Sequence, residues 1–416
     1  MRRLRRGPTS GGSRAIPLVS ESAVRRPAGW LPGIEALRAV AAGVVVIHHS
    51  WSLGTQKRFP GYWAVQGFGS LGVNLFFLLS GYLLADYFWR APAERPLGAF
   101  YVRRLLRIVP AYYVNVLLLV LFFVPHASVF SARGAKQVMA NLTFTQYLWP
   151  GMSGSFNANG ALWTLTIEMI LYLAMPLLAL AIGRWTWVAA AALAAIGVGW
   201  RVCLGVGGDA QFGVWFKDVP DFDRAIGSLY IGRQFVGFLP IFALGILVKR
   251  LAWSGRLDSL RRRLPPLRTP VLVLLLVPST LWLVYIERAS LYNRWIWFSL
   301  HDHVMVMLAV PALLYAAQPV IGPLARSMRV LTWLGDRSYG LYLWHFPIIL
   351  SIYGRGTLTS APSTTYPVLR LVLIIGLSVL FAHVSYIAIE RPAQGFGRRV
   401  VAWQSRGRVA AEGVLG

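Results

Sequence analysis

The chain has 416 residues, of which 56% are hydrophobic and 13% aromatic, and its formal net charge is +26. Several apolar runs are long enough to cross the roughly 30 Å hydrocarbon core of a bilayer, which indicates a polytopic membrane protein and excludes a soluble domain. The basic residues lie in the short segments between these runs, as topology determinants do, so nucleic acid is not an expected partner.

Residues 1–31 are basic and rich in Gly, Ser and Pro, and they lack the apolar core and cleavage site of a signal peptide. We therefore expect a disordered cytoplasmic tail here. Residues 32–392 are expected to form one transmembrane domain, and residues 393–416 a basic cytoplasmic C-terminal tail with no second domain. The candidate spans lie near residues 34–52, 68–88, 108–125, 161–182, 186–205, 232–249, 269–286, 302–319, 338–353 and 366–388.

The distribution of charge is an independent test of these spans. Arginine clusters occur in both tails and in segments 89–107, 250–268 and 320–337, while the segments between them are poor in basic residues. This alternation predicts an all-α membrane protein of about ten transmembrane helices, in the plasma membrane, with both termini in the cytoplasm. The longest external segments, 126–160 and 206–231, are candidate lids or acceptor contacts.

The first span, EALRAVAAGVVVIHHSW, contains Arg38 and His49 in an otherwise apolar stretch. In a helix, a separation of eleven residues turns through about 1100°, so both residues share one face and lie about 16 Å apart along the axis. A charge in hydrocarbon is costly and indicates function. We expect Arg38 to hold an anion and His49 to transfer a proton. The simpler alternatives are an arginine that snorkels to the headgroups and an interfacial histidine.

Further polar residues follow along the chain. Asn74 in GVNLFFLLSGYLL and Glu168 in ALWTLTIEMILYL are expected in the outer half of the membrane, with Glu168 at a depth similar to that of His49. Arg103 and Arg107 in YVRRLLRIVPAYY are four residues apart and share one helix face at the cytoplasmic surface. Paired guanidinium groups suit phosphate recognition, but arginine is also expected there for topology alone.

The aromatic residues and the remaining histidine of the spans have two readings. Tyr342 and His345 in SYGLYLWHFPI lie near mid-membrane, where His345 is expected either to pack or to support a site. Trp163, Tyr172 and Tyr342 are typical of core or interfacial aromatics, although aromatic faces also stack on sugars.

A metal site is not expected. The chain has a single cysteine, Cys203, which excludes a cysteine metal cluster and an intrachain disulfide. His301 and His303 bracket Asp302, a spacing that suits metal binding, but the sequence offers no further convergent ligand.

Six motifs occur in the order and spacing of one known family. They are Arg38 followed after ten residues by His49, then GVNLFFLLSGYLL, RRLLRIVPAY, ALWTLTIEMILYL, SYGLYLWHFPI and SYIAIERP. From Pro32 to Pro392 the chain resembles the acyltransferase 3 superfamily of integral-membrane acyltransferases. The resemblance implies transfer of an acyl group, often acetyl, from acyl-CoA to hydroxyls of sugars, surface polysaccharides, glycolipids or macrolides. Acyl-CoA would be the donor substrate, with no bound cofactor.

The resemblance also implies roles for single residues. Arg38 and His49 look like the essential pair of the family, Arg103 and Arg107 like its phosphate-facing cluster, and Glu168 like its buried carboxylate.

The chain departs from the family at two positions. Family members often have Asp where Asn74 stands and a second acidic residue where Met169 stands. The first change weakens any claim that the second helix supplies a charge, and the second leaves Glu168 as the only carboxylate in that role. The terminal Glu390, Arg391 and Pro392 are expected to end the last helix and tie it down.

The expected chemistry has His49 as general base on an acceptor hydroxyl, with Glu168 either orienting it or stabilising its imidazolium. Two alternatives stay open: Glu168 as a structural ion-pair partner of an arginine, and a route in which His49 itself is acylated. Oxyanion donors are expected among Asn74, Ser80 and backbone amides near Gly81. The expected catalytic residues are His49, Glu168 and Arg38, and the expected substrate-binding residues are Arg103, Arg107, Asn74, Ser80, Trp163, Tyr342 and His345.

Two other functional classes fit a polytopic chain. A transporter or flippase for a glycolipid or small metabolite would carry sparse intramembrane charge as well, but it should show a repeat between its halves, and no tandem repeat is found. A sensor or scaffold subunit would not need an arginine clamp aligned with a histidine and a glutamate. Arginine is far commoner than lysine, as in GC-rich bacterial genomes, which favours a cell-envelope glycolipid or a secondary metabolite as acceptor.

Overall fold

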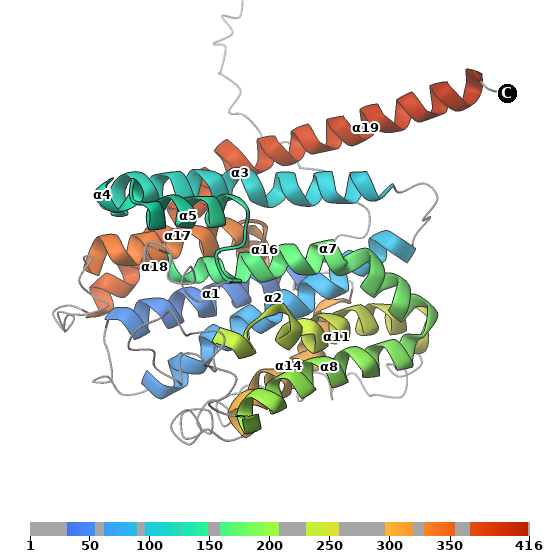
Figure 1. The fold of residues 1–416 in the computed structure, drawn as a ribbon, viewed down its shortest axis with the longest axis horizontal. Coiled ribbons are helices and arrows are strands. Elements are labelled where there is room, and N and C mark those ends of the chain that lie inside the picture. The colour runs from blue at the N-terminus through green and yellow to red at the C-terminus, as the bar shows by residue number, and fades with distance from the viewer. Residues whose placement is uncertain are drawn as a thin grey trace, which may run out of the picture.

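The computed structural model describes a bundle of α-helices that lie roughly side by side (Figure 1). The described residues are 31–54, 62–89, 96–124, 126–148, 159–207, 230–257, 296–318, 328–353 and 367–414. Within these ranges there are helices and turns but no strand, so the prediction of an all-α fold is confirmed.

The helices follow the apolar runs of the sequence. In chain order they are α1 (Pro32–Gly54), α2 (Tyr62–Trp89), α3 (Leu97–Phe123), α4 (His126–Val129), α5 (Ala132–Leu142), the 3-10 turn η4 (Gly160–Leu162), α7 (Trp163–Arg184), α8 (Thr186–Gly207), α11 (Phe235–Trp253), α14 (Ile296–Ala316), α16 (Arg329–Asp336), α17 (Ser338–Tyr353), α18 (Pro367–Ser385), the π-helical turn η6 (Tyr386–Glu390) and α19 (Arg391–Val414).

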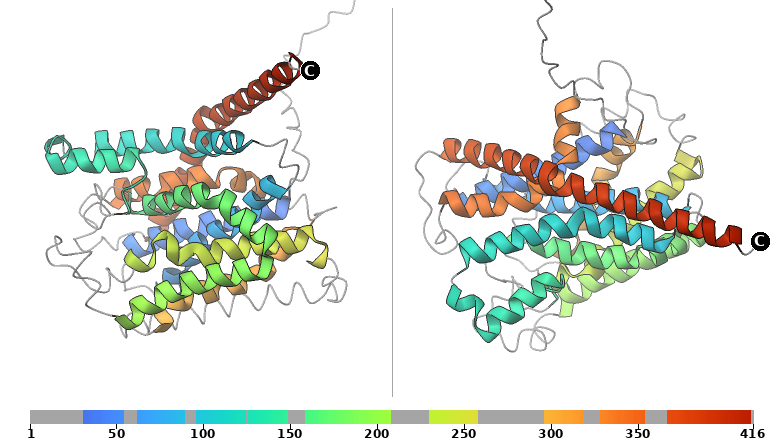
Figure 2. Two further views of the ribbon diagram at one scale, coloured as in Figure 1. Left: turned by 45° about the vertical axis from the view of Figure 1, so that its right-hand side comes forward. Right: turned by 90° about the horizontal axis from the view of Figure 1, so that it is seen from above.

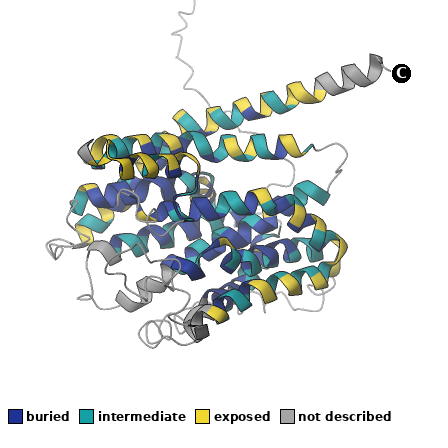
Figure 3. Ribbon diagram, in the orientation of Figure 1, coloured by how far each residue is buried: buried dark blue, intermediate teal, exposed yellow. Residues whose placement is uncertain are grey.

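Helix α1 lies inside the bundle. It packs against α2, α14, α16 and α17, while α2 packs on α11 and α11 on α8. Two views agree that α3 and α19 lie on one side of this core and α8 and α14 on the other (Figure 2). Buried residues concentrate on the inner helices and exposed ones on the outer faces (Figure 3). The residues of α1 are therefore placed where a site can be enclosed by several helices.

Six described helical segments are long and apolar enough to cross a membrane: Gly69–Trp89, Leu97–Phe123, Gly160–Arg184, Thr186–Cys203, Tyr230–Trp253 and Val368–Ser405. The prediction of a multi-pass helical protein is confirmed at this level, whereas ten spans and cytoplasmic termini stay predictions. Helix α1 is not among the six because Glu35, Arg38 and two histidines lower its hydropathy. The expected span at 269–286 lies outside the described residues.

The third span begins earlier than expected. Helix α3 starts at Leu97, directly after Pro96, so the arginines expected in a loop before residue 108 lie on the helix itself. Arginine and leucine are good helix formers, and a proline just before a helix is well tolerated, whereas hydropathy alone places a charged segment outside the membrane. Pro110 is accommodated inside the helix.

The last span does not end at Pro392 as expected. The π-helical turn η6 joins α18 to α19, which continues to Val414, and the Arg391 N–H donates to the Tyr386 carbonyl five residues earlier. The wider turn and the position of Pro392 in the first turn of α19 allow the chain to remain helical despite the missing N–H. Residues 393–414 are thus a helix that crosses α3 and extends beyond the bundle (Figure 2).

Two glycines allow α2 and α11 to meet backbone to backbone. A Cβ on Gly81 would collide with the Phe242 carbonyl, and one on Gly245 with the Leu78 carbonyl. Gly81, which the sequence suggested as an oxyanion-donor position, therefore lies in a helix contact. Small residues serve this purpose in membrane bundles, where close packing replaces the hydrophobic effect.

We expect Gly245→Ala to lower the thermal unfolding midpoint of the detergent-purified protein, since the added methyl must separate two backbones at a cost of about 1–3 kcal/mol. Gly376→Ala on α18 is the matched control, because a methyl group added at Gly376 would meet no atom within 4 Å. Equal midpoints for the two variants would contradict the packing role.

Candidate active site

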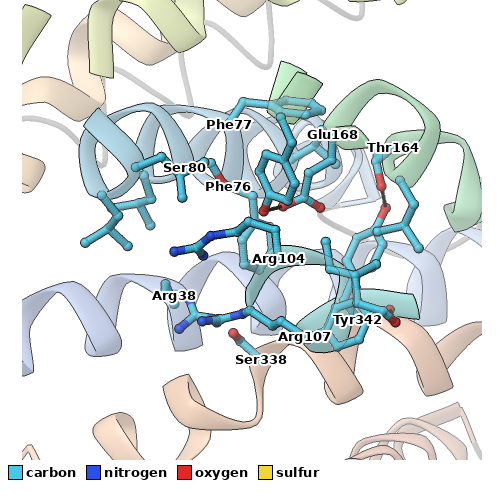
Figure 4. Close-up of a pocket in the computed structure, with 18 residues that line it drawn as sticks. Arg38, Phe76, Phe77, Ser80, Arg104, Arg107, Thr164, Glu168, Ser338 and Tyr342 are labelled. Carbon is cyan, nitrogen blue, oxygen red and sulfur yellow. Dashed lines mark hydrogen bonds between the residues drawn. The ribbon is translucent and has the colours of Figure 1, made fainter. Parts of the chain in front are cut away.

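A cavity lies between α1, α2, α3, α7 and α17 (Figure 4). It encloses about 820 Å³ of space between side chains, including the part that opens at the surface. Its polar lining consists of Arg38, Ser80, Arg104, Arg107, Thr164, Glu168, Tyr172, Ser338, Tyr339 and Tyr342. Five helices thus contribute to one site, and Arg38, Ser80, Arg107, Glu168 and Tyr342 of the residues expected from the sequence lie in it.

Three arginines form the basic part of this cavity. Arg38 comes from α1 and donates to the Glu35 carboxylate at 2.9 Å, while Arg104 and Arg107 come from α3. Within the described part of the chain neither Arg104 nor Arg107 has an ion pair, and the buried Nε of Arg104 has no hydrogen-bond partner. Guanidinium groups that gather without matching carboxylates favour an anion, most of all a phosphate.

Arg103 does not line the cavity, contrary to expectation. Its side chain is exposed and lies over the Tyr87 ring at 6.0 Å, and Arg104 takes its place beside Arg107. Residues three apart on a helix share a face as well as residues four apart do. The sequence was therefore equally compatible with Arg104 and Arg107 as the pair of arginines on one face. Ser338 was also missed: among the described residues its buried hydroxyl has no hydrogen-bond partner, and the residue lines the cavity.

Glu168 lies in the arginine cavity. Tyr172, one helical turn further along α7, donates its hydroxyl hydrogen to the Glu168 carboxylate. The carboxylate lies in the same cavity as Arg38, Arg104 and Arg107, whose positive charges act on it (Figure 4). Among the described residues Glu168 forms neither the expected hydrogen bond with His49 nor an ion pair with an arginine, and its hydrogen-bond partner is Tyr172.

His49 pairs with a histidine that the sequence places far away. Its Nδ1 lies 2.8 Å from Nε2 of His345, the two rings are nearly parallel at 20°, and Phe346 packs edge-on against His49. Nδ1 of His345 in turn lies 2.6 Å from the Tyr342 carbonyl oxygen. The side chain that contacts the His49 ring through a hydrogen bond is therefore that of His345 on α17.

Tyr342 links the histidine pair to the cavity. Its ring lines the cavity, its backbone carbonyl contacts His345, and its hydroxyl donates to the Ala161 carbonyl at 2.7 Å and lies 2.7 Å from the Thr164 hydroxyl. Along α1, Arg38 and His49 lie about 16 Å apart by helix geometry. Neither histidine lines the cavity, and Tyr342 is the residue that both lines it and contacts His345.

A proline and two asparagines shape α17 at this point. Pro347 has no N–H, so the Leu343 carbonyl four residues earlier loses its partner within the helix. Asn115 and Asn159 donate to that carbonyl at 3.2 and 3.1 Å, and a third hydrogen bond of 3.3 Å joins the two amides. These contacts anchor α17 next to His345. In the sequence this feature is visible only as a proline within an apolar run. The sequence does not show which side chains bond to the carbonyl that the proline frees.

Besides Arg103 and His345, two more of the expected substrate-binding residues do not line the cavity. Asn74 donates to Asp302 at 2.8 Å, and Asp302 also forms a buried ion pair with Arg201 at 2.7 Å. Trp163 packs against Tyr147, Phe238 and the guanidinium of Arg233.

The carboxylate of Asp302 is thus held by an arginine and an amide. Among the side chains that the structure describes, no three His, Cys, Asp or Glu residues gather as a metal site would require. The side chain of His301, the other expected ligand, lies outside the described part.

The comparisons with known proteins agree with the motifs. A family model described as an acyltransferase domain matches residues 31–387. The chain belongs to the acyltransferase 3 family. This confirms the resemblance, and the arginine cavity and the histidine pair of this acyltransferase both lie within the matched range.

Relatives of this chain include YrhL, named a putative peptidoglycan O-acetyltransferase, OatA, named a peptidoglycan O-acetyltransferase, and a nodulation protein. YrhL of Bacillus subtilis (strain 168) is 29% identical over 395 residues, covering 88% of this chain and 56% of YrhL. The peptidoglycan O-acetyltransferase OatA of Listeria monocytogenes is 25% identical over 387 residues, with the same coverage, and nodulation protein 10 of Rhizobium leguminosarum bv. viciae is 29% identical over 187 residues, covering 41% and 50%. The chain spans about half the length of these curated relatives. No solved structure matches it.

Proposed function

We propose that this chain is a membrane-bound O-acyltransferase that moves a short acyl group, acetyl first among them, from acyl-CoA to a hydroxyl of a carbohydrate. The observation that carries this proposal is the cavity that gathers Arg38, Arg104 and Arg107, of which Arg104 and Arg107 form no ion pair in the described part of the chain, together with the paired histidines further along α1 and α17. Family membership and a relative named peptidoglycan O-acetyltransferase support acetyl transfer to a cell-envelope sugar over transport. Glycolipids and macrolides are the other acceptors in this class.

The donor end of the site is the arginine cavity. Coenzyme A carries its phosphates at one end and the acyl thioester at the other, joined by a flexible arm. The cavity arginines would hold the phosphates, with Ser338 as a further donor, and the arm would extend past Tyr342 towards His49. Because acyl-CoA is cytosolic, we place this cavity on the cytoplasmic side of the plasma membrane, with both termini on that side.

The transfer step uses His49 as general base. As the acceptor hydroxyl oxygen bonds to the acyl carbon, its proton moves to His49; the carbon–sulfur bond then breaks and the CoA sulfur takes the proton from the imidazolium. Glu168 would act at a distance from this step, by limiting the repulsion among the three arginines when the donor is absent. Ser80 lines the arginine cavity, so in this mechanism it would contact the donor and not the oxyanion that forms beside His49.

The test is transfer of radioactive acetyl from acetyl-CoA to cell-surface glycans, lipids and added macrolides in membranes that contain the protein. We expect labelling of one acceptor fraction, and inhibition by adenosine 3′,5′-bisphosphate, which carries two of the phosphates of CoA without its arm. Adenosine without phosphates is the control and should not inhibit. Absence of transfer from any acyl-CoA would contradict the proposed function, and transfer insensitive to the bisphosphate would contradict the donor site.

A further inference from the structure

The partner of His49 is an unusual one for a general base. In the described residues neither His49 nor His345 is bonded to a carboxylate; each ring instead contacts the other, at 2.8 Å between Nδ1 of His49 and Nε2 of His345. His345 is 0% exposed and has its second nitrogen 2.6 Å from the Tyr342 carbonyl oxygen. The chain of contacts therefore runs from His49 through His345 to a backbone carbonyl.

These contacts determine where the hydrogens lie. A carbonyl oxygen can only accept, so Nδ1 of His345 carries a hydrogen and donates it to Tyr342. In the neutral ring Nε2 of His345 is then an acceptor, and its hydrogen-bond partner in the described part of the chain is Nδ1 of His49, which must donate. Protonation of His345 on both nitrogens would bury a cation with no counter-charge bonded to it, which is strongly unfavourable. His49 is left with Nδ1–H and a lone pair on Nε2.

We propose that His345 is a positioning residue that holds His49 in the tautomer with Nε2 free to take the acceptor proton. The proposal rests on the proposed function, because it assigns a role within that reaction. During transfer the hydroxyl proton moves to Nε2 of His49, while the Nδ1–H stays in its hydrogen bond to Nε2 of His345. His345 itself neither gains nor loses a proton.

The surroundings of His345 are built to keep the acceptor atom in place. The Tyr342 carbonyl fixes one side of the ring, and the Leu343 carbonyl next to it is bonded by Asn115 and Asn159 from two other segments. Phe346 packs against both histidine rings. A carboxylate in this position would add a second desolvated charge, whereas a neutral imidazole orients the base without one.

Two variants of His345 separate positioning from packing. His345→Gln retains an amide oxygen that reaches the Nε2 position and accepts from His49, while His345→Phe retains the volume of the ring but has no acceptor. We expect the Phe variant to lose about a hundredfold in kcat, a typical size for a lost acid–base contribution, with the KM for acetyl-CoA unchanged. The Gln variant should remain within about tenfold of wild type on the same scale. If His345 only fills space, the Phe variant should have a higher kcat than the Gln variant. Wild-type kcat in the Phe variant would overturn the proposal.

A measurement independent of activity tests the hydrogen-bond chain in the wild-type protein. The chain has seven histidines, few enough for nitrogen-15 NMR of selectively labelled protein with His49→Ala and His345→Gln to assign the two signals. We expect the protonated Nδ1 signature for both rings, and its loss from His49 in the Phe variant. A protonated Nε2 on His49 would overturn the proposal even if transfer is robust, whereas absent transfer by wild-type protein would overturn the proposed function and with it the catalytic role.

Discussion

Replacing His49 with alanine should abolish acyl transfer and leave acyl-CoA binding intact. A general base contributes at least about a hundredfold to kcat, and the proposed mechanism gives this role to His49. Arg38, one of the arginines proposed to bind phosphate, lies about 16 Å away along α1, so truncation of the imidazole should not change the Kd for a non-transferable acyl-CoA analogue. The measurements are turnover of labelled acetyl-CoA and binding of that analogue to the purified variant.

His48→Ala is the matched control for this substitution. His48 is the neighbouring residue on α1: its ring lies against Gly69 of α2 and edge-on to the His49 ring at 4.9 Å, while the hydrogen bond to His345 is made by His49. We expect it to retain most of the wild-type kcat. Transfer that survives in His49→Ala, or an equal loss in both variants, would contradict the assignment of His49 as the base.

Replacing an arginine of the cavity should weaken binding of the acyl-CoA donor and leave the rate of the transfer step largely unchanged. Each hydrogen bond to a charged group contributes about 1.5–3 kcal/mol, so Arg104→Ala and Arg107→Ala should each raise the Kd for acyl-CoA about tenfold to a hundredfold. The effect should appear in KM with kcat largely retained at saturating donor, and it should shrink at high salt because it is electrostatic. Titration of the binding of the acyl-CoA analogue at two salt concentrations measures it.

Arg103→Ala provides the matched control on the same helix. It removes the same charge one residue away, but from an exposed side chain that lies over Tyr87 outside the cavity. We expect a Kd within about twofold of wild type, as is usual for surface substitutions. If Arg103→Ala weakens binding as much as Arg104→Ala, the donor site is not the cavity described here but a general basic surface.

Periodicity within one helix was enough to predict part of the site. A separation of eleven positions places Arg38 and His49 on one face of any regular helix. Arg38 lines the cavity, whereas His49 does not line it and contacts His345. Helices, apolar spans and the family motifs follow from local composition in the same way, because membrane insertion and backbone hydrogen bonding act on each segment separately.

The sequence could not show which of two adjacent arginines faces the cavity, or which segments far apart in the chain contact each other. Arg103 and Arg104 are equally compatible with Arg107 on a helix, and only the packing of α3 against α7 and α17 turns Arg104 inward. His49 and His345 are 296 residues apart in the chain, and neither segment contains a feature that predicts its contact with the other. Glu168 was expected beside His49 at a similar depth, yet α7 turns it towards the arginines.

The sequence by itself therefore determined the membrane class, the helical segments, the family and the residue types available for chemistry. The tertiary structure decided which of these residues meet: Arg104 in place of Arg103, His345 in place of Glu168 beside His49, and Asn74 with Asp302 instead of with a substrate. The physical reason is that helix geometry acts over a few turns of one segment. The rotation and partner of each helix depend on close packing, such as that of Gly81 and Gly245 between α2 and α11, and on side-chain bonds to carbonyls freed by proline.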